Sequence, residues 1–189
     1  MQKGGVIVLV ILALLAIIVV SWYISGLNRV VRLDEQVDGA WAQVETQLQR
    51  RNDLIPNLVE TVKGYAQHER GLFEEVTRLR SDWARATTKE EKIENARAME
   101  SVLSRLLLVV ENYPQLRASE NFQTLQAQLE GTENRIAVER KRYNDAVRLF
   151  NTYIREVFGS FFAKRRGLTE AAPYFEAAPE ATEVPEVKF

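Results

Sequence analysis

Residues 33–63, "LDEQVDGAWAQVETQLQRRNDLIPNLVETVK", place an apolar side chain at nearly every third or fourth position. The repeated positions are Val37, Trp41, Val44, Leu48, Ile55, Leu58 and Val62. This spacing predicts one long helix with a single buried seam, which only Arg51 interrupts. Pro56 lacks an amide hydrogen and crowds the preceding turn, so we expect a kink inside this helix. Asp53 is close enough to cap the amides that such a kink frees.

Further apolar stripes of helical spacing follow along the chain. Their members are Leu72 or Phe73, Val76, Leu79 and Trp83, then Ile93, Ala96, Met99, Leu103, Leu106, Leu107 and Val110, then Phe122, Leu125, Leu129, Thr132, Ile136, Tyr143, Val147, Phe150, Ile154 and Val157. Each stripe gives its helix one apolar face, and the segments between the stripes are short. Short connections make sequential helices antiparallel. We therefore predict an all-α fold, with an antiparallel up-and-down four-helix bundle over residues 29–160.

Local signals mark where these helices begin and end. Thr88 to Glu91, "TKEE", has the form of a capping box, in which a hydroxyl is followed three residues later by a carboxylate. Pro114 disfavours helical geometry at Tyr113 and should close the same helix. Ser119 can cap the last helix. Gly64 offers a place for the chain to turn after the first helix.

The first 28 residues are different in character. Residues 4–28 carry no charge, and their long apolar run ends with Trp22, Tyr23 and Ile24. About 20 apolar residues can cross a hydrocarbon core of about 30 Å as a helix, and interfacial aromatics often mark its end. A cleaved signal peptide is the alternative, but the run is too long and no small-x-small cleavage site follows it. We expect residues 1–28 to be a retained single-pass membrane anchor.

Orientation follows from the positive charges on the two sides of the apolar run. Lys3 precedes it, whereas Arg29 and Arg32, and farther on Arg50 and Arg51, follow it. Because Lys and Arg mark the cytoplasmic side, this distribution favours a cytoplasmic bundle.

Composition excludes several classes of function. The 25 Lys and Arg residues against 26 Asp and Glu argue against a nucleic-acid partner, which would need a net positive face. The chain has no cysteine, and His68 is its single histidine, so thiolate metal sites and paired-histidine di-metal sites are excluded. No Gly-rich phosphate loop or G-x-S-x-G elbow is present. We assign no catalytic, cofactor-binding or metal-binding residue, and expect no enzyme activity and no cofactor.

Residues 161–189 are expected to form a basic and aromatic loop followed by an acidic, proline-containing, extended tail. In an up-and-down bundle the last helix returns toward the membrane, which would place this loop near the bilayer. Aromatic side chains beside basic ones suit an anionic membrane surface. The candidate membrane-surface residues are Arg29, Arg32, Phe161, Phe162, Lys164, Arg165 and Arg166. An ordinary solvated loop is the alternative.

Three long motifs carry a family resemblance. "QLQRRNDLIPNLVETVKGYAQHE" (47–69), "ENYPQLRASENFQTLQAQLEGTENRIAVERKRYNDAVRLFNTYI" (111–154) and "PYFEAAPEATEVPEVKF" (173–189) resemble the signature of the LemA family. The resemblance implies a membrane-anchored antiparallel four-helix bundle in a bacterial envelope, which places the anchor in the inner membrane, and it brings no catalytic residues. Some relatives are associated with membrane metallopeptidases or with the organisation of membrane compartments, which suggests partner or scaffold work.

Two hypotheses for function remain open. The first is a non-enzymatic scaffold or adaptor that binds the lipid bilayer, forms a homo-oligomer and contacts a membrane protein partner, with the extended tail able to add to a sheet edge or groove. The second is a regulator or ligand-binding partner of a membrane-bound enzyme such as a metallopeptidase, with a pocket near Pro56 lined by Arg51, Asp53 and last-helix residues. The candidate partner-binding residues are Arg50, Arg51, Asp53, Pro56, Asn57, Pro185, Val187 and Phe189. The alternative for the Pro56 segment is a kinked scaffold helix whose Arg51 pairs with an acid on a neighbouring helix.

Overall fold

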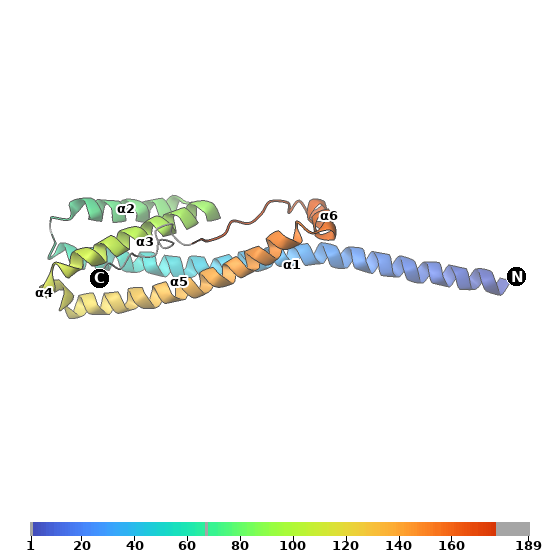
Figure 1. Ribbon diagram of the computed structural model, residues 1–189, viewed down its shortest axis with the longest axis horizontal. Helices are drawn as coiled ribbons and strands as arrows, with labels where there is room; N and C mark the ends of the chain where they lie inside the picture. Colours follow the sequence, from blue (N-terminus) through green and yellow to red (C-terminus); the bar gives the residue numbers. More distant parts are fainter. Residues whose placement is uncertain (1, 67, 177–189) are drawn as a thin grey trace, which may run out of the picture. The chain divides into compact units, whose positions relative to one another are not determined.

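The structure is a computed structural model that describes residues 2–66 and 68–176 (Figure 1). Its regular elements, in chain order, are α1 (Gln2–Lys63), α2 (Arg70–Arg85), α3 (Lys89–Glu111), α4 (Pro114–Arg117), α5 (Glu120–Tyr153) and α6 (Val157–Arg166). No strand occurs within these described ranges. The all-α prediction is therefore confirmed.

Helix α1 contains 62 residues and continues through Pro56. Every predicted seam position from Val37 to Val62 is buried, and Arg51 is buried among them with 2% of its surface exposed. The apolar run at the start of the same helix is not buried, because the residues from Val6 to Val20 are all exposed. The same helix therefore contains an apolar stripe that the protein buries and an apolar segment that is exposed around its whole circumference.

The described chain divides into two compact units. Unit 1 combines the chain up to Ala40 with Asn144–Ala172, and unit 2 combines Trp41–Tyr143 with the chain from Pro173. The main hydrophobic core lies in unit 2 and draws side chains from α1, α2, α3, α4 and α5. Its members include Ile55, Leu58, Val62, Phe73, Val76, Met99, Leu103, Leu106, Leu116, Phe122 and Leu129.

The ends of the helices in unit 2 follow the predicted signals. Thr88 and Glu91 form the reciprocal capping box that begins α3. Pro114 occupies the first turn of the short helix α4, where a missing amide hydrogen costs nothing. The Ser119 hydroxyl accepts a hydrogen bond of 3.3 Å from the amide of Phe122 at the start of α5. Helices α2 and α3, joined by a short turn, lie side by side (Figure 1).

In unit 1 the predicted last helix ends early, so part of the sequence expectation was wrong. Helix α5 ends at Tyr153, and the chain turns before α6 begins at Val157. Val157, expected in the buried seam, is 82% exposed. Gly159 explains how so tight a turn is possible, because a Cβ at this position would clash with the backbone oxygen of Tyr153. The basic and aromatic segment predicted as a loop is therefore helical through Arg166.

After α6 the chain carries no helix or strand from Gly167 to Glu176 but is held by specific contacts. Asn151 and Ala172 exchange hydrogen bonds of 2.9 and 2.8 Å in unit 1. In unit 2 the Tyr143 hydroxyl donates to the Pro173 carbonyl at 2.7 Å, and Phe175 is buried. This first part of the predicted extended tail is thus anchored to its neighbours.

Candidate functional site

Arg51 is a structural cation of unit 2. Its Nη1 lies 3.3 Å from Oε1 of Glu133 on α5, and its Nη2 donates to the Ala96 carbonyl on α3 at 3.1 Å. A buried guanidinium needs such partners, because an unpaired charge in the interior is strongly destabilising. The interpretation of Arg51 as a residue that pairs with an acid on a neighbouring helix is confirmed. Its side chain is consequently occupied within the protein.

A cleft of about 560 Å³ lies where the Pro56 segment of α1 faces α2. From α1 it is lined by Asn52, Asp53 and Pro56, and from α2 by Arg80 and Ser81. The hypothesis of a pocket near Pro56 expected Arg51 and last-helix residues in the wall. Neither lines this cleft, whose second wall is formed by α2 and the start of α3.

The other candidate residues of this segment occupy different surroundings. Arg50 and Asn57 are exposed. Asp53, expected to cap amides beyond the proline, accepts a 2.8 Å hydrogen bond from Gln49 in the preceding turn. Pro185, Val187 and Phe189 lie outside the described residues. The structure therefore brings only Asp53 and Pro56, of the predicted partner-binding residues, into the wall of the cleft.

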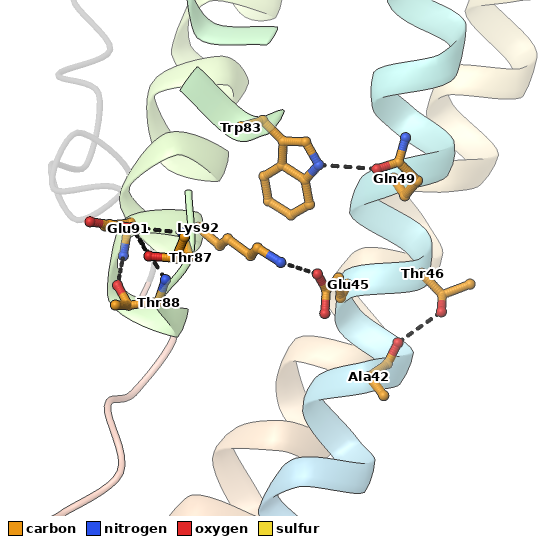
Figure 2. Close-up of polar contacts among 9 residues, drawn as sticks. All are labelled: Ala42, Glu45, Thr46, Gln49, Trp83, Thr87, Thr88, Glu91 and Lys92. Atoms are coloured by element: carbon orange, nitrogen blue, oxygen red, sulfur yellow. Dashed lines mark hydrogen bonds and ion pairs between the residues drawn. The ribbon is translucent and has the colours of Figure 1, made fainter. Parts of the chain in front are cut away.

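Several side chains that line the cleft connect α1 to its neighbours (Figure 2). The Trp83 indole Nε1–H donates to Oε1 of Gln49 at 3.1 Å. Lys92 forms an ion pair with Glu45, and its ammonium also lies 5.6 Å from the centre of the Trp83 ring. These contacts hold α2 and the first turn of α3 against α1.

Glu91 steadies the same first turn of α3 (Figure 2). Its Oε2 accepts hydrogen bonds from the backbone amides of Thr87 at 2.8 Å and Thr88 at 3.2 Å. These amide donors hold the pKa of the Glu91 carboxyl below its ordinary value, because they favour the charged form.

Asn52 is an unsatisfied polar group in the wall of the cleft. Only 3% of its surface is exposed, and its Oδ1 has no hydrogen-bond partner. In addition, Pro56 has no amide hydrogen to donate to the Asn52 carbonyl one turn earlier. A buried acceptor without a donor costs about 1–3 kcal/mol. This oxygen is itself enclosed, so it lowers the stability of the fold without offering an accessible binding position, and sequence reasoning did not single it out.

A second candidate region lies in unit 1, where α6 packs on α1 at the end of the apolar run (Figure 1). The Trp22 ring meets Phe158 and Phe162 edge-on, with centroid distances of 5.5 and 5.1 Å. Tyr23 meets Phe161 and Phe162 at 6.4 and 5.9 Å. Edge-to-face geometry is the favoured arrangement for such aromatic pairs. The aromatic segment therefore packs against the end of the apolar run within this unit.

Gly26 explains the closeness of this packing. A Cβ at Gly26 would clash with the ring of Phe162, which is only 2% exposed. The Gly26 carbonyl also accepts a hydrogen bond of 3.3 Å from the Tyr153 hydroxyl at the end of α5. Burial raises the pKa of Tyr153, and the neighbouring Arg29 guanidinium, 4.8 Å from the ring centre, opposes that shift. Phe162, predicted to face a membrane, is therefore part of the packed interior of unit 1.

The basic residues of this region remain at the surface. Lys164, Arg165 and Arg166 form the last turn of α6, where cations complement the helix dipole. The Arg165 guanidinium lies 5.5 Å from the centre of the Phe161 ring. Arg32 is exposed on α1. Two exposed apolar residues that the sequence analysis did not assign to this surface, Val157 and Phe158, lie in the first turn of the same helix.

Two further observations concern a possible membrane helix and possible metal ligands. Among the described residues, α1 is the one helix long and apolar enough to cross a membrane, and none of its most apolar stretch is buried. Within the same residues, no group of three His, Cys, Asp or Glu side chains is arranged to hold a metal ion. His68 is exposed in the turn between α1 and α2.

Comparison with known proteins agrees with the motifs and the helical architecture. Residues 40–189 match the model of the LemA family. The chain belongs to the LemA family. This LemA-family chain is 24% identical to the magnetosome proteins MamQ 1 and MamQ 2 of Paramagnetospirillum magneticum, over 94% of its own length and 75% of theirs. It is 21% identical to protein LemA of Metamycoplasma hominis, over 86% of its own length and 74% of that relative.

Proposed function

We propose that this LemA-family chain is a non-enzymatic, membrane-anchored interaction protein of the bacterial inner membrane. The observation that carries the proposal is the contrast within α1. Its apolar first part is exposed throughout, whereas the apolar seam from Val37 to Val62 is buried. Exposed apolar surface of this extent is stable in a bilayer rather than in water. The same helix therefore anchors the chain and enters the helical core.

We infer a single-pass topology, with an antiparallel up-and-down four-helix bundle on the cytoplasmic side. Short connections between α1, α2, α3 and α5 support the antiparallel order, and the arginines that follow the apolar run support the orientation. The chain has no native cysteine, so single cysteines report topology cleanly. A cysteine in place of Tyr65, which is 47% exposed, should resist a membrane-impermeant maleimide in intact cells and react after lysis.

The interaction role is either self-association or service as an adaptor for a membrane protein. Two of the relatives are named magnetosome proteins, which supports a role at a cellular structure of this kind. The chain carries nearly equal numbers of basic and acidic residues, 25 and 26, and such mixed charges also suit a contact with another protein.

Purification of the full-length protein from its native membrane in mild detergent tests the interaction role. A large homo-oligomer supports a scaffold, a stoichiometric second protein supports an adaptor, and a lone monomer opposes both. The anchor is tested by Leu12→Lys, with Leu149→Lys on α5 as the matched control. These leucines are exposed to similar extents, 55% and 53%. Only the first substitution should release protein into the soluble fraction, because a lysine is costly at the bilayer centre.

A second candidate function is supported by the cleft beside Pro56. The exposed side chains of Asp53 and Arg80 in its wall suit a polar segment of a partner. In this form the chain would regulate a membrane-bound enzyme by binding through the α1–α2 side. Arg80→Ala should weaken capture of a co-purifying partner, while Arg148→Ala, an exposed arginine of α5, should leave it unchanged. Equal capture by both variants would oppose the cleft as the contact.

A further inference from the structure

We propose that α6 is an interfacial helix that places its first turn in the headgroup region of an anionic bilayer and its last turn against the lipid phosphates. The inference rests on the proposed membrane anchor and adds a second contact between this protein and the lipid surface. It commits to anionic phospholipid as the occupant of the exposed face of α6.

The position of α6 on α1 is the first support. Trp22 and Tyr23, which contact the phenylalanines of α6, close the apolar run at the level where interfacial aromatics lie. Polar and charged residues begin immediately afterwards, at Ser25, Asn28 and Arg29. A helix that packs against Trp22 and Tyr23 therefore lies at the boundary between hydrocarbon and water whenever α1 spans the membrane.

The composition of the free face is the second support. Val157 is 82% exposed, Phe158 64% and Phe161 42%. A single exposed apolar side chain is ordinary, but adjacent ones on a ten-residue helix form a patch that needs a covering surface. Because these residues lie beside the end of the apolar run, the headgroup and upper acyl region of the same bilayer can cover them.

The charge along α6 is the third support. The apolar residues occupy its first turns, and Lys164, Arg165 and Arg166 occupy its last turn. The helix itself has no acid, and the acids that flank it are Glu156 at its N-cap and Glu170 beyond its end. Basic side chains beside a membrane gain affinity for anionic headgroups. The segregation of apolar and basic residues along the helix axis predicts an inclined helix, with its apolar end deeper than its basic end.

The packing of α6 within unit 1 is preorganised. Phe162 fills the space above Gly26, and Gly159 allows the first turn to approach the carbonyl of Tyr153. Gly167, with φ of 72°, ends the helix, and the amide of Leu168 bonds back to the Ala163 carbonyl at 3.0 Å. The exposed face of α6 is therefore held in place before any lipid binds, which lowers the cost of ordering it.

The test uses full-length protein with one introduced cysteine, spin-labelled and reconstituted into phosphatidylcholine vesicles with or without phosphatidylglycerol. Three positions are compared: Ile18→Cys in the apolar run, Val157→Cys on α6 and Leu149→Cys on α5. Accessibility is measured to oxygen, which concentrates in lipid, and to a nickel chelate, which stays in water. We expect the Ile18 and Val157 labels to favour oxygen and the Leu149 label to favour nickel.

The basic turn is tested by combining Lys164→Gln, Arg165→Gln and Arg166→Gln. In phosphatidylglycerol vesicles this change should move the Val157 label several-fold toward nickel accessibility, and in pure phosphatidylcholine it should change little. A Val157 label as water-accessible as the Leu149 label, with the Ile18 label in lipid, overturns this inference alone. A water-accessible Ile18 label overturns the membrane anchor itself. A Val157 label shielded from both reagents overturns the lipid assignment in favour of a covering protein.

Discussion

Arg51 of α1 and Glu133 of α5 form an ion pair of 3.3 Å whose two members are buried to very different extents. The side chain of Arg51 is 2% exposed and that of Glu133 is 36% exposed. The carboxylate can be solvated without its partner, whereas the guanidinium cannot. The pair is therefore asymmetric, and removing one member differs in consequence from removing the other.

This asymmetry predicts the order of two substitutions. Glu133→Gln leaves a buried charge with weaker compensation and should lower the free energy of unfolding by about 2 kcal/mol. Arg51→Met keeps much of the side-chain volume, removes the buried charge and should cost less than about 1 kcal/mol. Urea unfolding of full-length protein in detergent, followed by helical circular dichroism, measures both. The reverse order would show that the hydrogen bond to the Ala96 carbonyl dominates.

The capping box of α3 predicts a pH dependence of stability. The folded-state pKa of Glu91 is lowered by the amides of Thr87 and Thr88. Glu91 therefore contributes stability above its unfolded-state pKa, and this contribution disappears as the pH falls through the lowered folded-state pKa. Glu91→Gln should reduce stability at neutral pH and flatten the loss on acidification. Thermal unfolding at neutral and acidic pH checks this, and parallel curves for both proteins would contradict it.

The packing of Phe162 on Gly26 predicts a position-specific effect of adding one methyl group. Gly26→Ala should destabilise unit 1 by about 1–3 kcal/mol, because the new Cβ overpacks the contact with the Phe162 ring. Gly39→Ala in the same helix meets no atom within 4 Å and should be stabilising by about 0.5–1 kcal/mol.

Two readouts separate these outcomes. Unfolding free energies distinguish the two alanine variants, and emission of Trp22, with Trp41 and Trp83 replaced by phenylalanine, reports the surroundings of α6. Combining Gly26→Ala with Phe162→Leu should recover part of the loss. Equal effects at the two glycines would contradict the packing.

The buried amide of Asn52 predicts a substitution that stabilises the protein. Asn52→Leu removes an unsatisfied buried acceptor and should raise the free energy of unfolding by up to about 1 kcal/mol. Asn57→Leu, at an exposed position in the same segment, should change it by less than about 0.5 kcal/mol. Urea unfolding of the two variants measures both changes. A destabilised Asn52→Leu protein would show that the amide already has a satisfying donor.

Much of the helical layout could be predicted because its signals are local. The seam from Val37 to Val62, the capping box at Thr88 and the break at Pro114 each follow from side chains within a few positions. The pairing of Arg51 followed from a general rule, since a charge in an apolar seam must find an opposite charge or a carbonyl.

The remaining features depend on which surfaces meet, and periodicity does not encode that. The apolar stripe of the last helix continues in sequence to Val157, so the turn after Tyr153 was missed. Gly159 was the available signal, because a glycine permits close backbone approach. The wall of the cleft was assigned to the last helix rather than α2 for a similar reason. A stripe shows which face of a helix is covered, but not which neighbour covers it.

The contact between Gly26 and Phe162 also has a consequence for how the chain can turn about its own anchor. A uniformly apolar helix has no preferred rotation about its own axis in a bilayer, because all its sides present the same kind of surface to the lipid. Here the missing side chain of Gly26 leaves a space that the Phe162 ring fills, so α6 packs on one particular side of α1. Rotation of α1 about its axis would therefore carry α6 with it, and unit 1 presents two different sides, one with α6 and one without.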